Sequence, residues 1–204
     1  MADLTRLPDQ AQLILASAST ARTRLLSDAG VAHICDPADI DEAELKADWL
    51  GSPEGLAEHL AIEKARAISV RHAGKWVIGA DQVLALKNIV FDKPKTKDKA
   101  RTQLLQLRGC EHRLISAVAL IRDEEVMWSQ VDTAVLKMRL FSEAFLDQYL
   151  NQVETGVFFS VGGYHLEGLG AQLFEHVDGD YFTVLGLPLM PLLATLRSHQ
   201  ILTQ

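Results

Sequence analysis

The sequence predicts a mixed α/β sheet covered by helices, and three observations carry this prediction. Short apolar runs alternate along the chain with longer segments whose apolar residues recur at helical spacing. Residues 113–140 form a long apolar stretch that the acidic turn Asp123-Glu124-Glu125 interrupts, a pattern typical of an antiparallel hairpin. No internal repeat or linker is visible, and so we expect residues 1–204 to form a single domain.

The first elements follow a strand, helix, strand order. The apolar run 12–16 predicts a strand, and the next segment carries leucines at helical spacing before Gly30, a residue suited to a left-handed helix stop. Residues 31–35 predict the second strand. The stretch 36–63 is strongly acidic, and we expect its first half to be a solvated loop.

The middle of the chain contains the clearest helix and the clearest strand. Ser52-Pro53 predicts the start of a helix that runs to about His72, because the hydroxyl caps the first turn and proline suits its first position. Residues 76–86 predict a strand, which the two-residue turn Lys87-Asn88 joins to a return strand at 89–92.

The C-terminal half continues the alternation of helices and strands. In chain order, we expect a helix capped by Thr96 that reaches Arg108, the hairpin, a helix from Ser142 to about Asn151, a strand at 173–177 and a helix that starts at Pro188. The run Tyr181–Leu196 lacks charge but is shorter than the roughly 20 residues that cross a membrane, so we expect a buried strand, turn and helix there.

Composition excludes several kinds of partner. The chain carries 20 Lys and Arg against 27 Asp and Glu, a formal charge of −7. Stable binding to nucleic acid or to an anionic membrane is therefore not expected. Cys35 and Cys110 form no metal-binding spacing and fit a reducing compartment. The N-terminal MADLTRLPDQ lacks the pattern of a secretory signal, so we expect a cytoplasmic protein.

The segment Ser17–Arg22 joins a strand to a helix and is the first candidate site. A helix N-terminus presents unpaired N–H groups and a partial positive charge, which together attract anions. Arg22 lies in the first turn, where its charge opposes the helix dipole unless an anion is bound. The segment therefore indicates phosphate binding, and a solvated arginine beside an ordinary serine cap is the alternative.

Charged and polar side chains also interrupt two apolar patterns. Asp81 and Gln82 lie within an apolar strand, and we expect Asp81 to meet a metal, a cation or a cleft unless it lies at a strand end in water. Counting pairs from the turn places Lys93 opposite Gln82. Lys64 lies in the apolar stripe of the long helix, where it either partners a ligand or extends its ammonium to water.

Two further segments offer ligand-binding groups. The acidic loop Asp39–Glu42 carries hard oxygen ligands of the kind that Mg²⁺ or Mn²⁺ prefers, unless these charges are simply solvated. The segment 162–181 combines glycines, which let backbone approach a ligand, with tyrosines and with Glu167. A carboxylate at that position can accept hydrogen bonds from a guanine-type N–H edge, and tight turns between strands are the alternative.

The order of these segments resembles the Maf family of nucleoside triphosphate pyrophosphatases, from Leu13 to Arg197. Eight motifs carry the resemblance in family order: LASASTARTRLL, DIDE, LAIEKARA, IGADQVL, FDKP, LRGCEHRL, GYHLEGLGA and GDYFTVLGLPL. It implies a house-cleaning hydrolase that cleaves the α–β phosphoanhydride bond of a nucleoside triphosphate, giving nucleoside monophosphate and pyrophosphate. It also implies an elongated mixed sheet with two lobes around a central cleft, as in ITPase-like proteins, a Mg²⁺ or Mn²⁺ cofactor, and a homodimer.

The resemblance also assigns roles to matching positions. It implies that Asp81, Lys64 and Lys93 are the catalytic residues, with Asp81 and Asp41 serving the metal and the attacking water. The two lysines would grip the triphosphate. A hypothesis from another class is a regulator of cell division or septum formation that binds nucleotide without turnover.

Substrate binding is implied at five positions, three of which differ from residues that are common in other members. Ser19 and Arg22 would hold phosphate, and Ala21 stands where many members have an arginine. Members that act on dTTP and UTP usually have threonine and glutamine where this chain has Gln82 and Glu167. This pair is similar to the branch that acts on 7-methyl-GTP.

Overall fold

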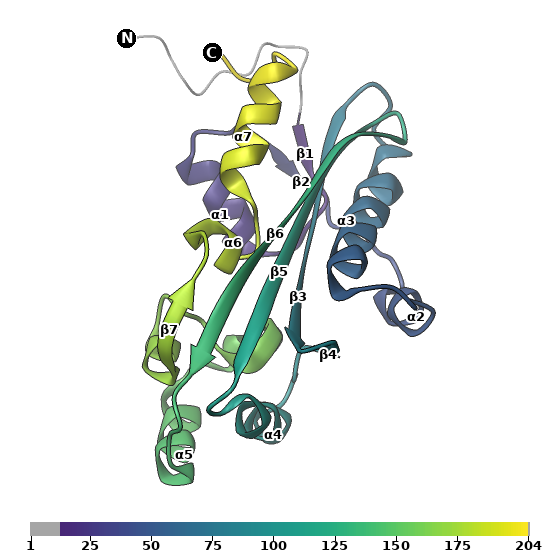
Figure 1. Ribbon diagram of the computed structural model, residues 1–204. Helices are drawn as coiled ribbons and strands as arrows, with labels where there is room; N and C mark the ends of the chain where they lie inside the picture. Colours follow the sequence, from purple (N-terminus) through teal and green to yellow (C-terminus); the bar gives the residue numbers. More distant parts are fainter. Residues whose placement is uncertain (1–12, 204) are drawn as a thin grey trace. The chain divides into compact units, whose positions relative to one another are not determined.

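The computed structural model describes residues 13–203, whose strands form one mixed sheet (Figure 1). The strand order is β2-β1-β3-β5-β6-β7, with β4 paired to β3. Strand β1 pairs in parallel with β2 and β3, whereas β3 with β4 and β6 with β7 are antiparallel. The predicted fold class, a mixed sheet flanked by helices, is confirmed. The strands are β1 Leu13–Leu15, β2 Ile34–Cys35, β3 Trp76–Leu86, β4 Ile89–Phe91, β5 Glu111–Arg122, β6 Glu125–Met138 and β7 Phe174–Asp178.

Helix starts follow hydroxyl caps, of which Ser52, Thr96 and Ser142 were predicted. Ser19, Ser52, Thr96 and Ser142 each accept a hydrogen bond from the backbone N–H three residues later, which satisfies a donor that the first helical turn leaves unpaired. The helices are α1 Thr20–Asp28, α2 Glu42–Ala47, α3 Pro53–Ser69, α4 Lys97–Leu107, α5 Glu143–Gln152, α6 Tyr181–Val184 and α7 Leu189–Ser198, with 3-10 turns η1 Thr155–Phe159, η2 Val161–Gly163 and η3 Leu169–Leu173.

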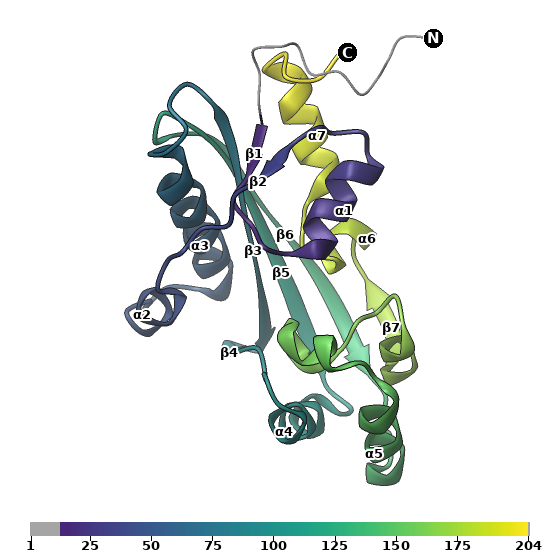
Figure 2. The same ribbon diagram turned by 180° about the vertical axis from the view of Figure 1, so that it is seen from behind.

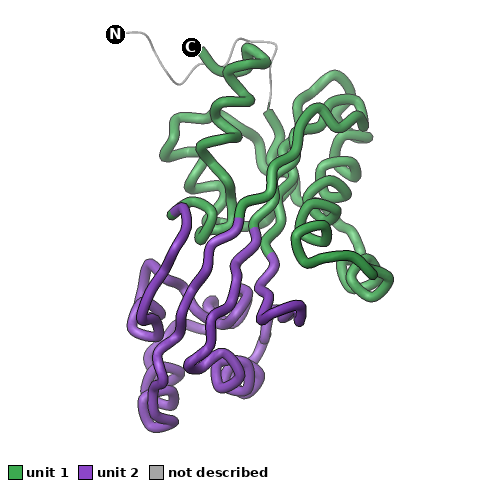
Figure 3. Tube along the Cα trace, in the orientation of Figure 1, with its two compact units in different colours: residues 1–82, 116–132, 181–204 green, residues 83–115, 133–180 purple. Residues whose placement is uncertain are grey.

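The chain divides into two compact units, coloured separately in Figure 3. The first unit contains the chain up to Gln82, Ser116–Asp132 and the segment from Tyr181 on. The second contains Val83–Ile115 and Thr133–Asp180. The expectation of a single domain over residues 1–204 stays a prediction.

In the first unit, β1 and the part of β3 that precedes Gln82 are buried on both faces. Leu13, Leu15 and Ile78 pack with leucines of α1 and α7, whereas Ile14 and Val77 pack with apolar residues of α3. This alternation arises because successive side chains of a strand point to opposite faces of the sheet. Figures 1 and 2 show α1 and α7 on one side of these strands and α3 on the other.

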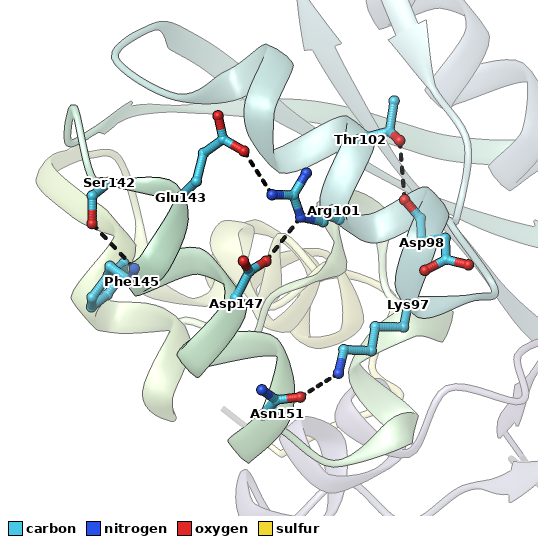
Figure 4. A network of polar contacts seen from close by, with 9 residues as sticks. All are labelled: Lys97, Asp98, Arg101, Thr102, Ser142, Glu143, Phe145, Asp147 and Asn151. Atoms are coloured by element: carbon cyan, nitrogen blue, oxygen red, sulfur yellow. Dashed lines mark hydrogen bonds and ion pairs between the residues drawn. The ribbon is translucent and has the colours of Figure 1, made fainter.

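In the second unit, polar contacts join α4 and α5 (Figure 4). The Arg101 guanidinium contacts Glu143 at 2.7 Å and Asp147 at 2.9 Å, and Lys97 donates to the Asn151 side chain at 2.5 Å. These charges are largely exposed, so each contact contributes little, although together they fix the pairing of the two helices.

Three local predictions are wrong. The acidic segment contains the short helix α2, whose start Asp41 caps, instead of a solvated loop. The second strand covers only Ile34–Cys35 of the predicted 31–35. Tyr181–Val184 is helical although its aromatic and β-branched residues favour a strand, because tertiary context overrides such propensities.

The turn Lys87-Asn88 is confirmed by the pairing of Leu86 with Ile89 and of Leu84 with Phe91. Among the described residues, no helix combines the length and apolar character needed to cross a membrane. The segment MADLTRLPDQ, on which the prediction about a secretory signal rests, lies outside the described residues.

Candidate functional site

Asp81 lies on the face of β3 that α3 covers, and Gly79 makes this approach possible. A Cβ atom at Gly79 would clash with the carbonyl oxygen of Ala61 and would lie 2.8 Å from the Ala65 Cβ, so only glycine lets the helix lie this close to the strand. Asp81 is two residues further along the same strand face. Lys64 follows Ala61 by three residues on the same helix face, and this places its side chain beside Asp81.

The Lys64 ammonium forms two ion pairs. It lies 2.5 Å from Oδ1 of Asp81 and 2.8 Å from Oε1 of Glu42. Lys64 and Asp81 are only 9% and 6% exposed, so neither charge is hydrated as it would be on the surface. The prediction that Asp81 meets a cation is therefore confirmed, and the ammonium of Lys64 contacts carboxylates instead of extending freely to water.

Glu42 also belongs to this cluster, although the sequence indicated it only as part of the acidic segment Asp39–Glu42. The neighbouring Asp41 caps α2, because its Oδ1 accepts from the backbone N–H groups of Ala43 at 3.0 Å and Glu44 at 3.1 Å. Glu42 is thus the first residue of the helix and reaches Lys64 of α3. The cap pattern could have revealed the helix start, but not the direction of the Glu42 side chain.

Arg22 lies close to the same carboxylates. Its Nε donates to the carbonyl oxygen of Gly186 at 2.8 Å and its Nη1 donates to Oγ of Ser17 at 3.2 Å. Burial lowers the pKa of the Arg22 guanidinium, and the negative charges of Asp81 and Glu42 oppose that shift. The structure therefore brings Arg22, Lys64, Asp81 and Glu42 into one electrostatic neighbourhood.

The start of α1 carries a serine cap, as one of the two alternatives for this segment has it. Oγ of Ser19 accepts from the backbone N–H of Arg22 at 3.4 Å, and the Ser19 backbone N–H donates to Oγ of Ser17 at 3.2 Å. Ala21 lies in the first turn and is partly exposed. With a methyl side chain it offers apolar contact only, and the role of this turn in phosphate binding stays a prediction.

Gln82 points to the opposite face of the sheet from Asp81, because consecutive strand residues alternate. Its Nε2 donates to Oγ of Ser116 at 3.0 Å and to the carbonyl oxygens of Thr183 at 3.1 Å and Val184 at 3.0 Å. Asp81 and Gln82 are therefore adjacent in sequence but contact different elements, α3 and the end of α6.

Two predicted site residues belong to the second unit. Lys93 is exposed and follows the end of β4 by two residues. Glu167 is exposed in the turn before η3, where the Gly168 N–H donates to the His165 carbonyl oxygen at 3.3 Å. The pairing of Lys93 with Gln82 and the roles of Lys93 and Glu167 stay predictions.

The cluster around Lys64 offers two carboxylates to a divalent cation. The described residues contain no group of three or more His, Cys, Asp and Glu side chains arranged to hold a metal. However, the carboxylates of Glu42 and Asp81 converge on one ammonium, and Mg²⁺ is commonly held by one or two carboxylates together with substrate phosphates and waters. This pair fits such a metal when a phosphorylated ligand supplies the remaining oxygens.

Comparisons with known proteins show the family of this chain. The family model described as "Maf-like protein" matches residues 12–199. Relatives named nucleoside triphosphate pyrophosphatase from Paramagnetospirillum magneticum and Bradyrhizobium diazoefficiens are each 50% identical, over 91% and 93% of this chain and 97% and 95% of their own lengths. A Mesorhizobium japonicum relative named 7-methyl-GTP pyrophosphatase is 45% identical over 92% of this chain and 96% of its own length. The chain therefore belongs to the Maf family.

Proposed function

We propose that this chain is a nucleoside triphosphate pyrophosphatase, a hydrolase that releases nucleoside monophosphate and pyrophosphate. The observation that carries the proposal is the buried contact of Lys64 with Asp81 and Glu42 beside Arg22. The names of the relatives at about half identity support the same reaction. An acid, a lysine and an arginine in one place suit the attack of water on a polyanionic substrate.

In the proposed reaction, the Asp81 carboxylate orients the attacking water and accepts its proton. The oxygen of the water forms a bond to phosphorus, and the bond from the α-phosphorus to the bridging oxygen breaks. Pyrophosphate leaves with the electron pair of that bond. Lys64 stabilises the negative charge that develops on the phosphate oxygens, while Arg22 and the start of α1 hold the phosphates in place.

A bound Mg²⁺ or Mn²⁺ would neutralise phosphate charge and polarise the phosphoryl group. Asp81 and Glu42 are the carboxylates proposed to hold it, and Asp41 is a further candidate from the sequence prediction. The four charges of Asp81, Glu42, Lys64 and Arg22 sum to zero, so they do not by themselves neutralise a triphosphate. This balance supports a requirement for an added cation.

The remaining assignments rest on the family resemblance. Lys93 is proposed to grip the triphosphate and Ser19 to contact phosphate. Gln82 and Glu167 are proposed to select a guanine-type base, with 7-methyl-GTP as the favoured substrate. Two relatives at 44% and 45% identity carry the name 7-methyl-GTP pyrophosphatase, which supports this choice.

A screen of nucleoside triphosphates with Mn²⁺ or Mg²⁺ tests the proposal. The wild-type protein is expected to release pyrophosphate from at least one of them, and chelation of the metal is expected to abolish the release. Tight nucleotide binding without pyrophosphate release would favour a regulator without turnover and contradict the proposal. Asp132→Asn, which changes an acidic residue of β6 outside the cluster, serves as a matched control and should retain full activity.

A further inference from the structure

The segment Thr183–Gly186, which comprises the last two residues of α6 and the turn that follows them, has no role in the assignments above, yet its backbone holds two proposed substrate-binding side chains. The carbonyl oxygen of Gly186 accepts from Arg22, and the carbonyl oxygens of Thr183 and Val184 accept from Gln82. All of these residues belong to the first unit. We call Thr183–Gly186 the α6–α7 turn.

The contact with Gly186 fixes the orientation of the Arg22 guanidinium. This group is planar and carries five N–H donors, so hydrogen bonds from Nε to Gly186 at 2.8 Å and from Nη1 to Ser17 at 3.2 Å set both its position and its plane. A Cβ atom at Gly186 would lie 3.6 Å from Nη2 of Arg22 and 3.6 Å from Oε1 of Gln82. Gly186 therefore packs against both side chains at once.

The same turn fixes which end of the Gln82 amide is presented. Nε2 faces three acceptors, Oγ of Ser116 and the carbonyl oxygens of Thr183 and Val184. The Ser116 hydroxyl donates its own hydrogen to the Thr183 carbonyl at 2.7 Å, so its lone pairs are available to Gln82. A flipped amide would place its carbonyl oxygen against two other carbonyl oxygens. Gln82 therefore presents its Oε1, an acceptor, on the side of Gly186.

We propose that the α6–α7 turn is a positioning element for substrate binding, with Gly186 orienting Arg22 and with Ser116 and the Thr183 and Val184 carbonyls orienting Gln82. The inference rests on the proposed function. It implies that a ligand group beside Gln82 is a hydrogen-bond donor. The positive φ of 95° at Gly186 is a conformation that favours glycine, and it directs the carbonyl oxygen toward Arg22.

Gly186→Ala tests the Arg22 contact. The space beside Gly186 admits a methyl group, so the substitution acts through backbone strain that rotates the carbonyl away from Arg22. Gly30→Ala is the matched control, since Gly30 has a φ of 71° and nothing within 4 Å of an added Cβ. We expect Gly186→Ala to raise the KM for nucleotide about tenfold with kcat within about twofold, and Gly30→Ala to change neither.

A double-mutant cycle separates positioning from a general loss of structure. In an Arg22→Ala background, Gly186→Ala should change KM by less than about twofold, because the side chain that it positions is gone. Ser116→Ala should lower kcat/KM in the wild-type protein, because Ser116 orients Gln82. In a Gln82→Ala background, Ser116→Ala should leave kcat/KM unchanged. Fully additive effects, or an equal effect of Gly30→Ala, would overturn the inference.

The failure of the inference can be told apart from the failure of the proposed function. If the wild-type protein hydrolyses no nucleotide, the proposed function fails. The same cycle is then measured as the Kd of a triphosphate whose α–β bridge is non-hydrolysable. Coupling of Gly186 to Arg22 in that Kd supports the positioning role, and additivity contradicts it.

Discussion

Asp81 and Lys64 are both buried charged residues, and each offsets the cost of burying the other by forming an ion pair with it. An isolated buried ion loses several kcal/mol of hydration, and a close ion pair recovers this only with good geometry. The distance of 2.5 Å between Nζ of Lys64 and Oδ1 of Asp81, with Glu42 at 2.8 Å from the same nitrogen, supplies that geometry. The proposed activation of a water molecule by Asp81 rests on this arrangement.

Asp81→Asn should lower kcat by about 10²-fold or more, because the carboxylate proposed to accept the proton is replaced by a neutral amide of the same shape. The fold should be retained, since Lys64 keeps its contact with Glu42. Steady-state kinetics together with a thermal melt checks both expectations. Hydrolysis near the wild-type rate would refute the role of Asp81.

Lys64→Met should destabilise the fold by about 3 kcal/mol, because it removes the ammonium that contacts the carboxylates of Asp81 and Glu42. Activity should fall as well. Urea unfolding of the single variant and of Lys64→Met/Asp81→Asn checks the cause. The double variant should recover part of the lost stability, and a single variant as stable as wild type would contradict the account.

For single residues, the sequence reveals charged side chains within apolar patterns, but it does not reveal which of them contact each other. Asp81 and Lys64 both interrupt apolar patterns, which is why each could be singled out. Their mutual contact could not be read, because the residues are 17 positions apart and their meeting depends on the glycine at position 79 that admits α3. The contact of Glu42 with Lys64 was not predicted, because Glu42 lies in a run of acidic residues that is typical of a solvated surface.

Among the elements, those with strong periodicity or clear caps were predictable. The strand Trp76–Leu86 matches its predicted bounds, and the four hydroxyl caps mark real helix starts. Helix α2 buries none of its residues, so it has no apolar stripe to detect. It is stabilised by the Asp41 cap, by acids in its first turn and by Lys46 in its last turn, which all suit the helix dipole.

His112 of β5 ties the segment around η2 to the sheet of the second unit. It is 1% exposed, and its Nε2 lies 2.7 Å from the Tyr164 hydroxyl. Burial lowers the pKa of His112 to about 4, while its unfolded value is 6.5. Between these values the unfolded chain binds a proton that the folded chain does not, so stability is retained above pH 6.5 and falls as the pH drops toward 4.

His112→Phe should therefore flatten the dependence of the free energy of unfolding on pH in that window, by roughly 3 kcal/mol between pH 6.5 and 4. Its stability at pH 7 should also fall, because the Tyr164 hydroxyl loses its partner. Denaturant unfolding at several pH values measures the slope. His176→Gln, at an exposed position of β7, should keep the wild-type slope. An unchanged slope in His112→Phe would exclude this linkage.

For the whole molecule, the resemblance to the Maf family predicted the family, which the spacing of apolar residues alone could not indicate. The family holds over residues 12–199, and the mixed sheet flanked by helices was predicted correctly. Composition indicated a chain unsuited to nucleic acid but could not name a nucleotide substrate. The homodimer and the cytoplasmic location stay predictions, since both depend on surfaces and signals that apolar pattern does not encode.

The preferred base is a property of the whole protein. We expect kcat/KM to be higher for 7-methyl-GTP and GTP than for dTTP and UTP. The reason is that a carboxylate such as that of Glu167 can accept hydrogen bonds from guanine-type N–H groups but has no donor for the carbonyl oxygens of thymine or uracil. Glu167→Gln should reduce this ratio. A preference for pyrimidines in the wild-type protein would overturn the assigned base and leave the reaction class intact.

The most direct test of the account is the identity of the products from the preferred nucleoside triphosphate and a divalent metal. Cleavage between the α and β phosphates predicts nucleoside monophosphate and pyrophosphate in equal amounts, resolved by ion-exchange chromatography, with Asp81→Asn reducing both together. Nucleoside diphosphate and orthophosphate, formed at the rate at which substrate disappears, would contradict it.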